Sequence, residues 1–197
     1  IPIIRYLQER KCEVIIAADG RPLQLLQKEF PSCEFVQMPG YNISYPKNGS
    51  MVLKMASQIP KILSGIKREH ELLKKIIKEK KIDAVISDNR FGLWSREVPC
   101  VFITHQLMVK SPFGEKFIHQ LNKSYISKYS ECWVPDAKDG GLSGDLSHKF
   151  PLPKNAKYIG VLSRFTSTPS LLLKEKGVRD EVLIILSGPE PQRTIFE

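Results

Sequence analysis

The residue best suited to proton transfer is His105, which follows the apolar run "CVFIT" at 100–104 and precedes Gln106. An imidazole titrates near neutral pH, so His105 could act as a general acid, a general base or a hydrogen-bond donor to a ligand. Equally, His105 could be a structural residue whose imidazole only forms hydrogen bonds with nearby backbone groups. His105 and Gln106 are therefore candidate site residues. The remaining histidines are expected on helix or loop surfaces, without a role: His70, His119 and His148.

Two further apolar runs end in polar residues of the kinds that contact ligands. Asp19 and Gly20 follow the first of these runs, and the second ends in Asp88, followed by Asn89 and Arg90. An Asp or Asn in this place can equally cap the helix that comes next. Both interpretations stay open, and these five residues join the candidate site.

The last stretch, "VLIILSGPEPQRTIFE", is the third place where chemistry could occur. An apolar run opens into a loop that introduces a helix, and backbone N–H groups at a helix N-terminus bind anions well. An arginine in the loop can add positive charge. The loop therefore predicts contact with a diphosphate, although a plain strand-to-helix turn would also explain it. Its candidate residues are Ser187, Gly188, Glu190, Gln192, Arg193 and Thr194.

The periodicity of the chain predicts the elements that position these residues. Apolar β-branched runs indicate buried strands at 13–18, 33–38, 83–88, 100–104, 131–135 and 156–160, and helical spacing indicates helices at 2–10, 21–29, 51–80 and 114–128. Residues 51–80 could form one helix or two, with Pro60 marking a break or a new first turn, and we expect a short helix near Leu93. Strands that alternate with helices predict an α/β fold with a doubly wound, mostly parallel, Rossmann-like sheet. In such sheets ligands bind beyond the carboxyl ends of the strands.

Changes of composition along the sequence also predict a division into domains. Residues 1–161 form the first Rossmann-like domain, and the polar segment 162–180, broken by Pro169 and Gly177, is expected to be a linker. Residues 181–197 would then be the first strand and loop of a second α/β domain. The opening "IPIIRYLQERKC" is already helical in pattern, so we expect polypeptide upstream of Ile1.

Composition limits the classes of function. The 197 residues are 42% hydrophobic with a mean hydropathy of -0.21, typical of a globular protein, and no apolar run is long enough to span a bilayer. The four cysteines show no ligand spacing and are expected to be buried free thiols, and no histidine has a metal-binding neighbour, so no metal is expected.

The net charge of +9 favours anionic partners. Much of it lies in Lys67–Lys81, where apolar residues at helical spacing place the lysines on the opposite face. That face is either simply solvated or a patch for acidic phospholipid headgroups. Nucleic acid is not expected as a partner, because no aromatic interleaving or nucleic-acid signature accompanies the charge.

Three segments together resemble a known family. "IPIIRYLQERKCEVIIAADGRP", "DAVISDNRFGLWSREVPCVFITHQL" and "VLIILSGPEPQRTIFE" resemble, in order and spacing, bacterial MurG-like glycosyltransferases of family 28, which have the GT-B fold. The resemblance implies two Rossmann-like domains facing across a cleft, with the acceptor held by the first and the nucleotide-sugar by the second. It implies that the 187–194 loop meets the donor diphosphate and that Asn89, Arg90, His105 and Gln106 line the cleft.

The resemblance also implies the chemistry. The expected reaction is an inverting, metal-independent transfer of an N-acetylglucosamine-like sugar from a UDP-sugar to an acceptor hydroxyl, with a lipid-linked acceptor at the inner face of the cytoplasmic membrane. A glycine-rich loop that carries the main catalytic base would precede Ile1, so this chain by itself is expected to be inactive. Two other hypotheses remain: a nucleotide-sugar 2-epimerase on the same fold, and a non-catalytic nucleotide-binding module.

Overall fold

Parallel strands joined by helices make up the computed structural model, which describes residues 1–40, 51–108 and 115–162. Each apolar run predicted from the sequence forms a strand three or four residues long. The strands are β1 (Ile15–Ala18), β2 (Glu34–Gln37), β3 (Val85–Asp88), β4 (Cys100–Ile103), β5 (Glu131–Val134) and β6 (Ala156–Tyr158). The helices are α1 (Pro2–Glu9), α2 (Gly20–Glu29), α3 (Met51–Lys80), α4 (Glu115–Ile126) and α5 (Asp145–His148).

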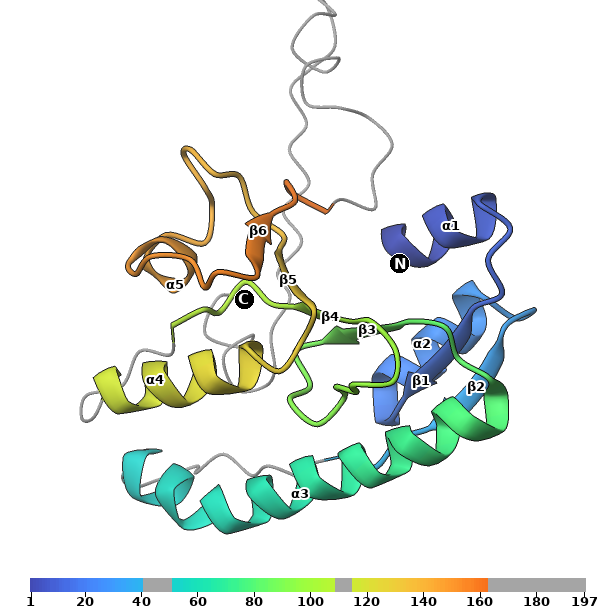
Figure 1. Cartoon of the computed structure of the whole chain (residues 1–197), viewed down its shortest axis with the longest axis horizontal. Coiled ribbons are helices and arrows are strands. Elements are labelled where there is room, and N and C mark those ends of the chain that lie inside the picture. The colour runs from blue at the N-terminus through green and yellow to red at the C-terminus, as the bar shows by residue number, and fades with distance from the viewer. Residues whose placement is uncertain (41–50, 109–114, 163–197) are drawn as a thin grey trace, which may run out of the picture. The chain divides into compact units, whose positions relative to one another are not determined.

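The strands form two sheets in which every hydrogen-bonded pair is parallel. β1 pairs with β2, and the larger sheet has the order β3-β4-β5-β6. In Figure 1, β1 lies between β2 and β3, so the small sheet presents β1 toward the large one. The predicted α/β class with parallel, Rossmann-like strands is confirmed. The strands do not, however, hydrogen-bond into one continuous sheet.

The core of the larger sheet forms where the middle strands meet α4. Phe102 of β4 and Cys132 and Val134 of β5 are fully buried, and they pack with Ile126 and Tyr129 from the end of α4 and the turn after it. Parallel strands covered on both faces bury side chains of either direction, which explains the nearly unbroken apolar runs. The carboxyl ends of β3, β4 and β5 are therefore fixed relative to one another.

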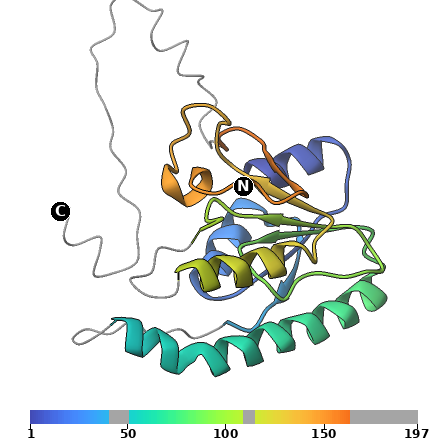
Figure 2. The ribbon, with the colours of Figure 1, turned by 60° about the vertical axis from the view of Figure 1, so that its left-hand side comes forward.

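Helix α3 runs along one side of the described residues, with α1 on the opposite side (Figures 1 and 2). Its Leu73 and Ile77 pack against Met38 at the end of β2 and against Leu93. Of the two alternatives, one helix or two, the structure has one, since α3 continues through Pro60. Proline has no backbone N–H, so the helix forms one backbone hydrogen bond fewer at this residue.

Two other elements differ from the sequence prediction. No helix forms near Leu93, where residues 90–98 make turns. A Cβ atom on Gly92 would lie 2.5 Å from the Ile66 carbonyl oxygen and 2.6 Å from Glu69 Cβ, so this segment packs directly on α3. The four-residue helix α5 was not predicted, because it is too short for a periodic pattern.

Residues 1–162 form one compact unit. The predicted linker at 162–180 and the predicted start of a second domain fall almost wholly outside the described residues. Free thiols are confirmed at all four cysteines, but burial is confirmed only for Cys100 and Cys132, since Cys33 is half-buried and Cys12 is exposed. Within the described part of the chain, no helix has both the length and the apolar character needed to cross a bilayer.

Candidate functional site

The candidate residues of the first domain occupy the carboxyl ends of three strands. Asp88 ends β3, and His105 follows β4 two residues after its last residue. Because β3 and β4 are paired neighbours, with Asp88 in register with Ile103, these two residues belong to the same edge of the sheet. Asp19 follows β1 and is the N-cap residue of α2, although its side chain makes no capping hydrogen bond.

Asp88 contributes a carboxyl group with a shifted pKa to this edge of the sheet. Burial raises the pKa of its carboxyl group, whereas the nearby His105 lowers it, and burial is the larger effect. A carboxyl group and an imidazole thus lie near one another at the edge of the sheet where α/β proteins bind ligands.

Asn89 has an unusual backbone conformation that aims its side chain toward the next strand. Its φ of +53° lies in the left-handed region, which asparagine tolerates better than most residues. Its Oδ1 accepts a hydrogen bond of 3.2 Å from Thr104 Oγ1, which in turn accepts one of 3.0 Å from the backbone N–H of Gln106. This relay fixes the loop that carries His105. The Gln106 carbonyl is held from the other side by Asn122 Nδ2 at 3.1 Å.

The guanidinium of Arg90 is committed to internal partners. It donates to the buried carboxylate of Glu69, with Nε at 2.6 Å from Oε1, to Asp19 Oδ1 at 3.3 Å, and to the carbonyl oxygen of Pro39. Its side chain is 16% exposed and that of Glu69 only 1%. Arg90 therefore joins the ends of β1, β2 and β3 to α3. Its place is at the predicted site, but its contacts are those of a structural clamp.

Sequence analysis missed a buried carboxylate at the end of β5. Asp136 accepts hydrogen bonds from the backbone N–H groups of Ala137 at 2.9 Å, Leu142 at 2.8 Å and Ser143 at 3.0 Å. Burial by itself would raise the pKa of Asp136, but these donors outweigh it and hold the pKa well below its usual range. The signal was available, since Asp136 follows an apolar strand just as Asp19 does.

The same carboxylate fixes α5 to the strand ends. Ser147 Oγ donates to Asp136 Oδ2 at 3.0 Å, and His148 Nε2 lies 3.2 Å from it. His148 Nδ1 is 3.1 Å from the Tyr158 hydroxyl, and the two rings stack. His148 is exposed on the short helix α5, as predicted, and its contacts here are structural. The network holds the loop from β5 to α5 in one conformation.

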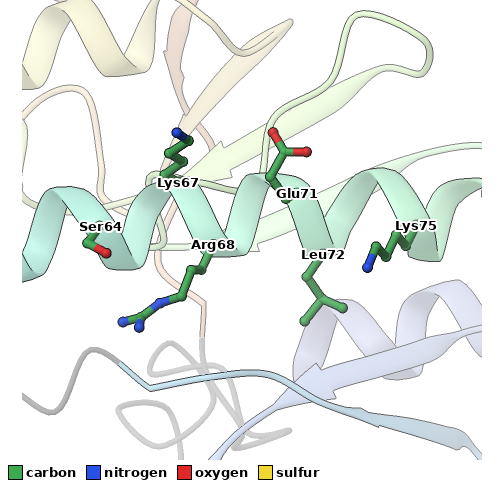
Figure 3. A pocket seen from close by; sticks show the side chains of 6 residues that line it. All are labelled: Ser64, Lys67, Arg68, Glu71, Leu72 and Lys75. Carbon is green, nitrogen blue, oxygen red and sulfur yellow. The ribbon is translucent and has the colours of Figure 1, made fainter.

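The basic segment predicted at Lys67–Lys81 lies on α3 and ends just after it. Figure 3 shows an open groove on this helix, lined by Ser64, Lys67, Arg68, Glu71, Leu72 and Lys75. Part of the charge is neutralised internally, since Lys74 pairs with Glu71 at 3.2 Å and Lys80 with Glu34 at 2.7 Å. Two large apolar residues, Ile59 and Leu63, are exposed on the same helix.

The proposed diphosphate loop, Ser187 to Thr194, lies outside the described residues. Among residues 1–40, 51–108 and 115–162, no three His, Cys, Asp or Glu side chains gather in a way that could hold a metal ion.

Comparison with known proteins adds one distant structural likeness. No protein-family model and no curated protein matches the chain. Among solved structures, it is similar to a "putative UDP-N-acetylglucosamine 2-epimerase" from Listeria monocytogenes, with a TM-score of 0.35 and 12% identity over 74% of this chain. The match spans 44% of that protein's length.

Proposed function

We propose that the intact protein is a glycosyltransferase that moves a sugar from a nucleotide diphosphate donor, with UDP-N-acetylglucosamine as the first candidate, to an acceptor hydroxyl. The observation that supports it most is that Asp88 and His105 lie at the same carboxyl edge of β3 and β4. The resemblance of the "DNRFG", "THQ" and "SGPEPQRT" segments to family 28 glycosyltransferases supplies the reaction.

In this proposal His105, rather than the upstream base that the family resemblance implies, takes the proton of the acceptor hydroxyl. As the hydroxyl oxygen bonds to the anomeric carbon of the sugar, the bond from that carbon to the diphosphate breaks, and the configuration inverts. The Asp88 carboxylate stabilises the imidazolium formed on His105. The relay from Asn89 through Thr104 holds the backbone on either side of His105. The leaving diphosphate is met by Arg193 and the N–H groups of its loop.

The first test is turnover of UDP-N-acetylglucosamine by the intact protein with and without acceptor. Release of UDP only when an acceptor is supplied supports the transferase. Conversion of the donor to its 2-epimer in the absence of acceptor would assign the epimerase instead. Tight binding of UDP without turnover of any donor would leave a nucleotide-binding module, and the proposal would be wrong.

Replacing His105 tests its role as the base. We expect His105→Gln, which keeps hydrogen bonding but cannot accept the proton at neutral pH, to lower kcat by roughly 10²–10⁴-fold and to change KM for the donor little. Steady-state kinetics of the intact protein measure both constants. Gln120→Ala, an exposed change on α4, is the control. A His105→Gln variant with normal kcat would exclude His105 as the base.

The basic face of α3 supports a second part of the proposal, that the protein associates with an anionic membrane surface. The exposed lysines and arginine provide the charge, and Ile59 and Leu63 provide apolar contacts at the interface. The attraction is worth about 1 kcal/mol for each basic residue near the surface and is screened by salt. An acceptor attached to a lipid would then be reached without leaving the membrane.

Sedimentation with phosphatidylglycerol vesicles tests this association. We expect the double variant Lys67→Gln/Lys75→Gln to bind at least about tenfold more weakly than the unaltered protein, because two basic residues near the surface are lost. The control double variant Lys138→Gln/Lys154→Gln removes the same charge from exposed loop positions outside α3. Binding that is equal in both variants, or independent of salt, would rule out a specific membrane face on α3.

A further inference from the structure

The turn that carries His105 is held by elements far along the chain. Thr104, Leu107 and Met108 in this turn are buried, whereas His105 itself is exposed. The backbone N–H of Met108 donates a hydrogen bond of 3.0 Å to the carbonyl oxygen of Leu146, which belongs to α5. The connection between β4 and α4 therefore depends on the position of α5.

Asn122 of α4 supports the same turn. Its Nδ2 donates to the carbonyl oxygens of Gln106 at 3.1 Å and Leu107 at 3.0 Å. The residue is only 5% exposed, yet its Oδ1 has no hydrogen-bond partner among the described residues. A buried amide oxygen without a partner costs free energy, so the contribution of Asn122 at this position is the hold of its NH₂ group on the turn. Carbonyl groups of the turn are thus fixed by α4, and the Met108 N–H by α5.

Helix α5 needs partners outside itself to hold this position. It has four residues, and a helix of this length is unstable alone, because nucleation costs more free energy than its few hydrogen bonds return. Two groups outside the helix fix it. One is the Asp136 carboxylate, which Ser147 and His148 contact, and the other is the Tyr158 hydroxyl. The ends of β5 and β6 therefore set the position of the Leu146 carbonyl group.

The Tyr158 hydroxyl contacts α5 at two atoms. It donates a hydrogen bond of 2.8 Å to the Ser147 carbonyl oxygen and lies 3.1 Å from His148 Nδ1. Burial, followed by the charge of Asp136, raises the pKa of Tyr158, so the hydroxyl keeps its proton for this donation at neutral pH. The Ser147 carbonyl is next along the chain to that of Leu146. The hydroxyl therefore fixes the peptide group beside the one that holds the turn.

We infer that Tyr158 is a positioning residue for His105 and acts on it through α5. The connection runs from the hydroxyl through the adjacent carbonyl groups of Ser147 and Leu146 to the Met108 N–H in the turn. This role rests on the proposed function, in which His105 takes the proton of the acceptor hydroxyl. That transfer needs the imidazole within hydrogen-bond reach of the acceptor, so a shift of the turn lowers its rate.

Tyr158→Phe tests the inference, because it removes the hydroxyl and keeps the ring that stacks on His148. In the intact protein we expect kcat to fall about tenfold and the KM for the donor to change little. In the His105→Gln background the same change should lower kcat no further, because the imidazole that Tyr158 positions is already missing. Tyr6→Phe, at an exposed tyrosine of α1, is the matched control and should leave kcat unchanged.

Amide hydrogen exchange of the same variants gives a measurement that does not depend on activity. Tyr158→Phe should speed exchange at the Met108 amide at least about tenfold, because the acceptor of its hydrogen bond becomes mobile. The Cys132 amide, which bonds to the Asn155 carbonyl in the middle of the sheet, is the internal reference and should change less than about threefold.

Three results would overturn the inference while the proposed function stands. They are an unchanged kcat in Tyr158→Phe, a fall in kcat by the same factor with and without His105, and equal exchange at Met108 and Cys132. A normal kcat in His105→Gln alone would instead overturn the proposed base, and the role of Tyr158 with it. If the intact protein turns over no nucleotide-sugar, the proposed function fails, and exchange at Met108 then decides whether Tyr158 holds the turn through α5.

Discussion

Replacing Arg90 by methionine should lower the free energy of unfolding by about 3–5 kcal/mol, because it leaves the Glu69 carboxylate buried without its cationic partner. It also removes the bonds that tie Asp19 and the Pro39 carbonyl to β3. Urea denaturation measures the loss. The control is Arg96→Met, an exposed position in the same connection, with an expected change within about 0.5 kcal/mol.

A double variant separates the ion pair from other effects of the change. Glu69→Gln in the Arg90→Met background removes the buried carboxylate charge that Arg90 no longer faces, so a large part of the lost stability should return. If Arg90→Met is as stable as the unaltered protein but fails to bind a nucleotide-sugar, the clamp interpretation is wrong and Arg90 is a ligand-binding residue, as the resemblance to glycosyltransferases implied.

Asp136→Asn should lower the free energy of unfolding by at least about 3 kcal/mol at neutral pH. The Oδ2 position accepts from Ser143, Ser147 and His148, and an amide NH₂ placed there would face these donors with donors of its own. Asp139→Asn, in the exposed part of the same loop, is the control. Denaturant titration of the three proteins gives the difference.

The effect should depend on pH in a defined direction. The folded-state pKa of Asp136 is lowered, so its contribution to stability is present above the ordinary carboxyl pKa of about 4 and is lost as pH falls through the folded-state pKa. The difference between Asp136→Asn and the unaltered protein should therefore shrink below about pH 4. A difference that is constant from pH 7 to pH 2 would show that the ionised carboxylate is not what stabilises the loop.

The sequence predicted elements well where one pattern dominated. The apolar runs around Val85 and Phe102 were predicted to be strands, and their carboxyl ends bring Asp88 and His105 to one edge of the sheet. A break was considered at Pro60 because proline is unfavourable inside a helix. That rule considers only local backbone hydrogen bonding, and α3 continues through this residue. The turns near Leu93 depend on the contact of Gly92 with Glu69, two residues far apart in sequence.

The sequence could not predict which side chains bond to one another. The sequence predicts that Arg90 is a ligand-binding cation. The structure shows that it pairs with Glu69, a residue in the middle of a lysine-rich helix. The position of Asp136 after an apolar strand marked it as a candidate, but not its structural role, since its donors come from a glycine-rich loop and from α5. In both cases tertiary packing brings together groups whose individual patterns are uninformative.

The two buried cysteines have a chemical consequence for the middle of the sheet. Burial raises the pKa of the Cys132 thiol to about 12, and burial also raises that of Cys100. The thiolate is the form that reacts with oxidants and electrophiles, so both sulfurs are inert while β4 and β5 stay paired. Cys12, which is exposed just beyond α1, is open to such reagents. Oxidative damage would therefore begin beside the first helix and leave the centre of the sheet intact.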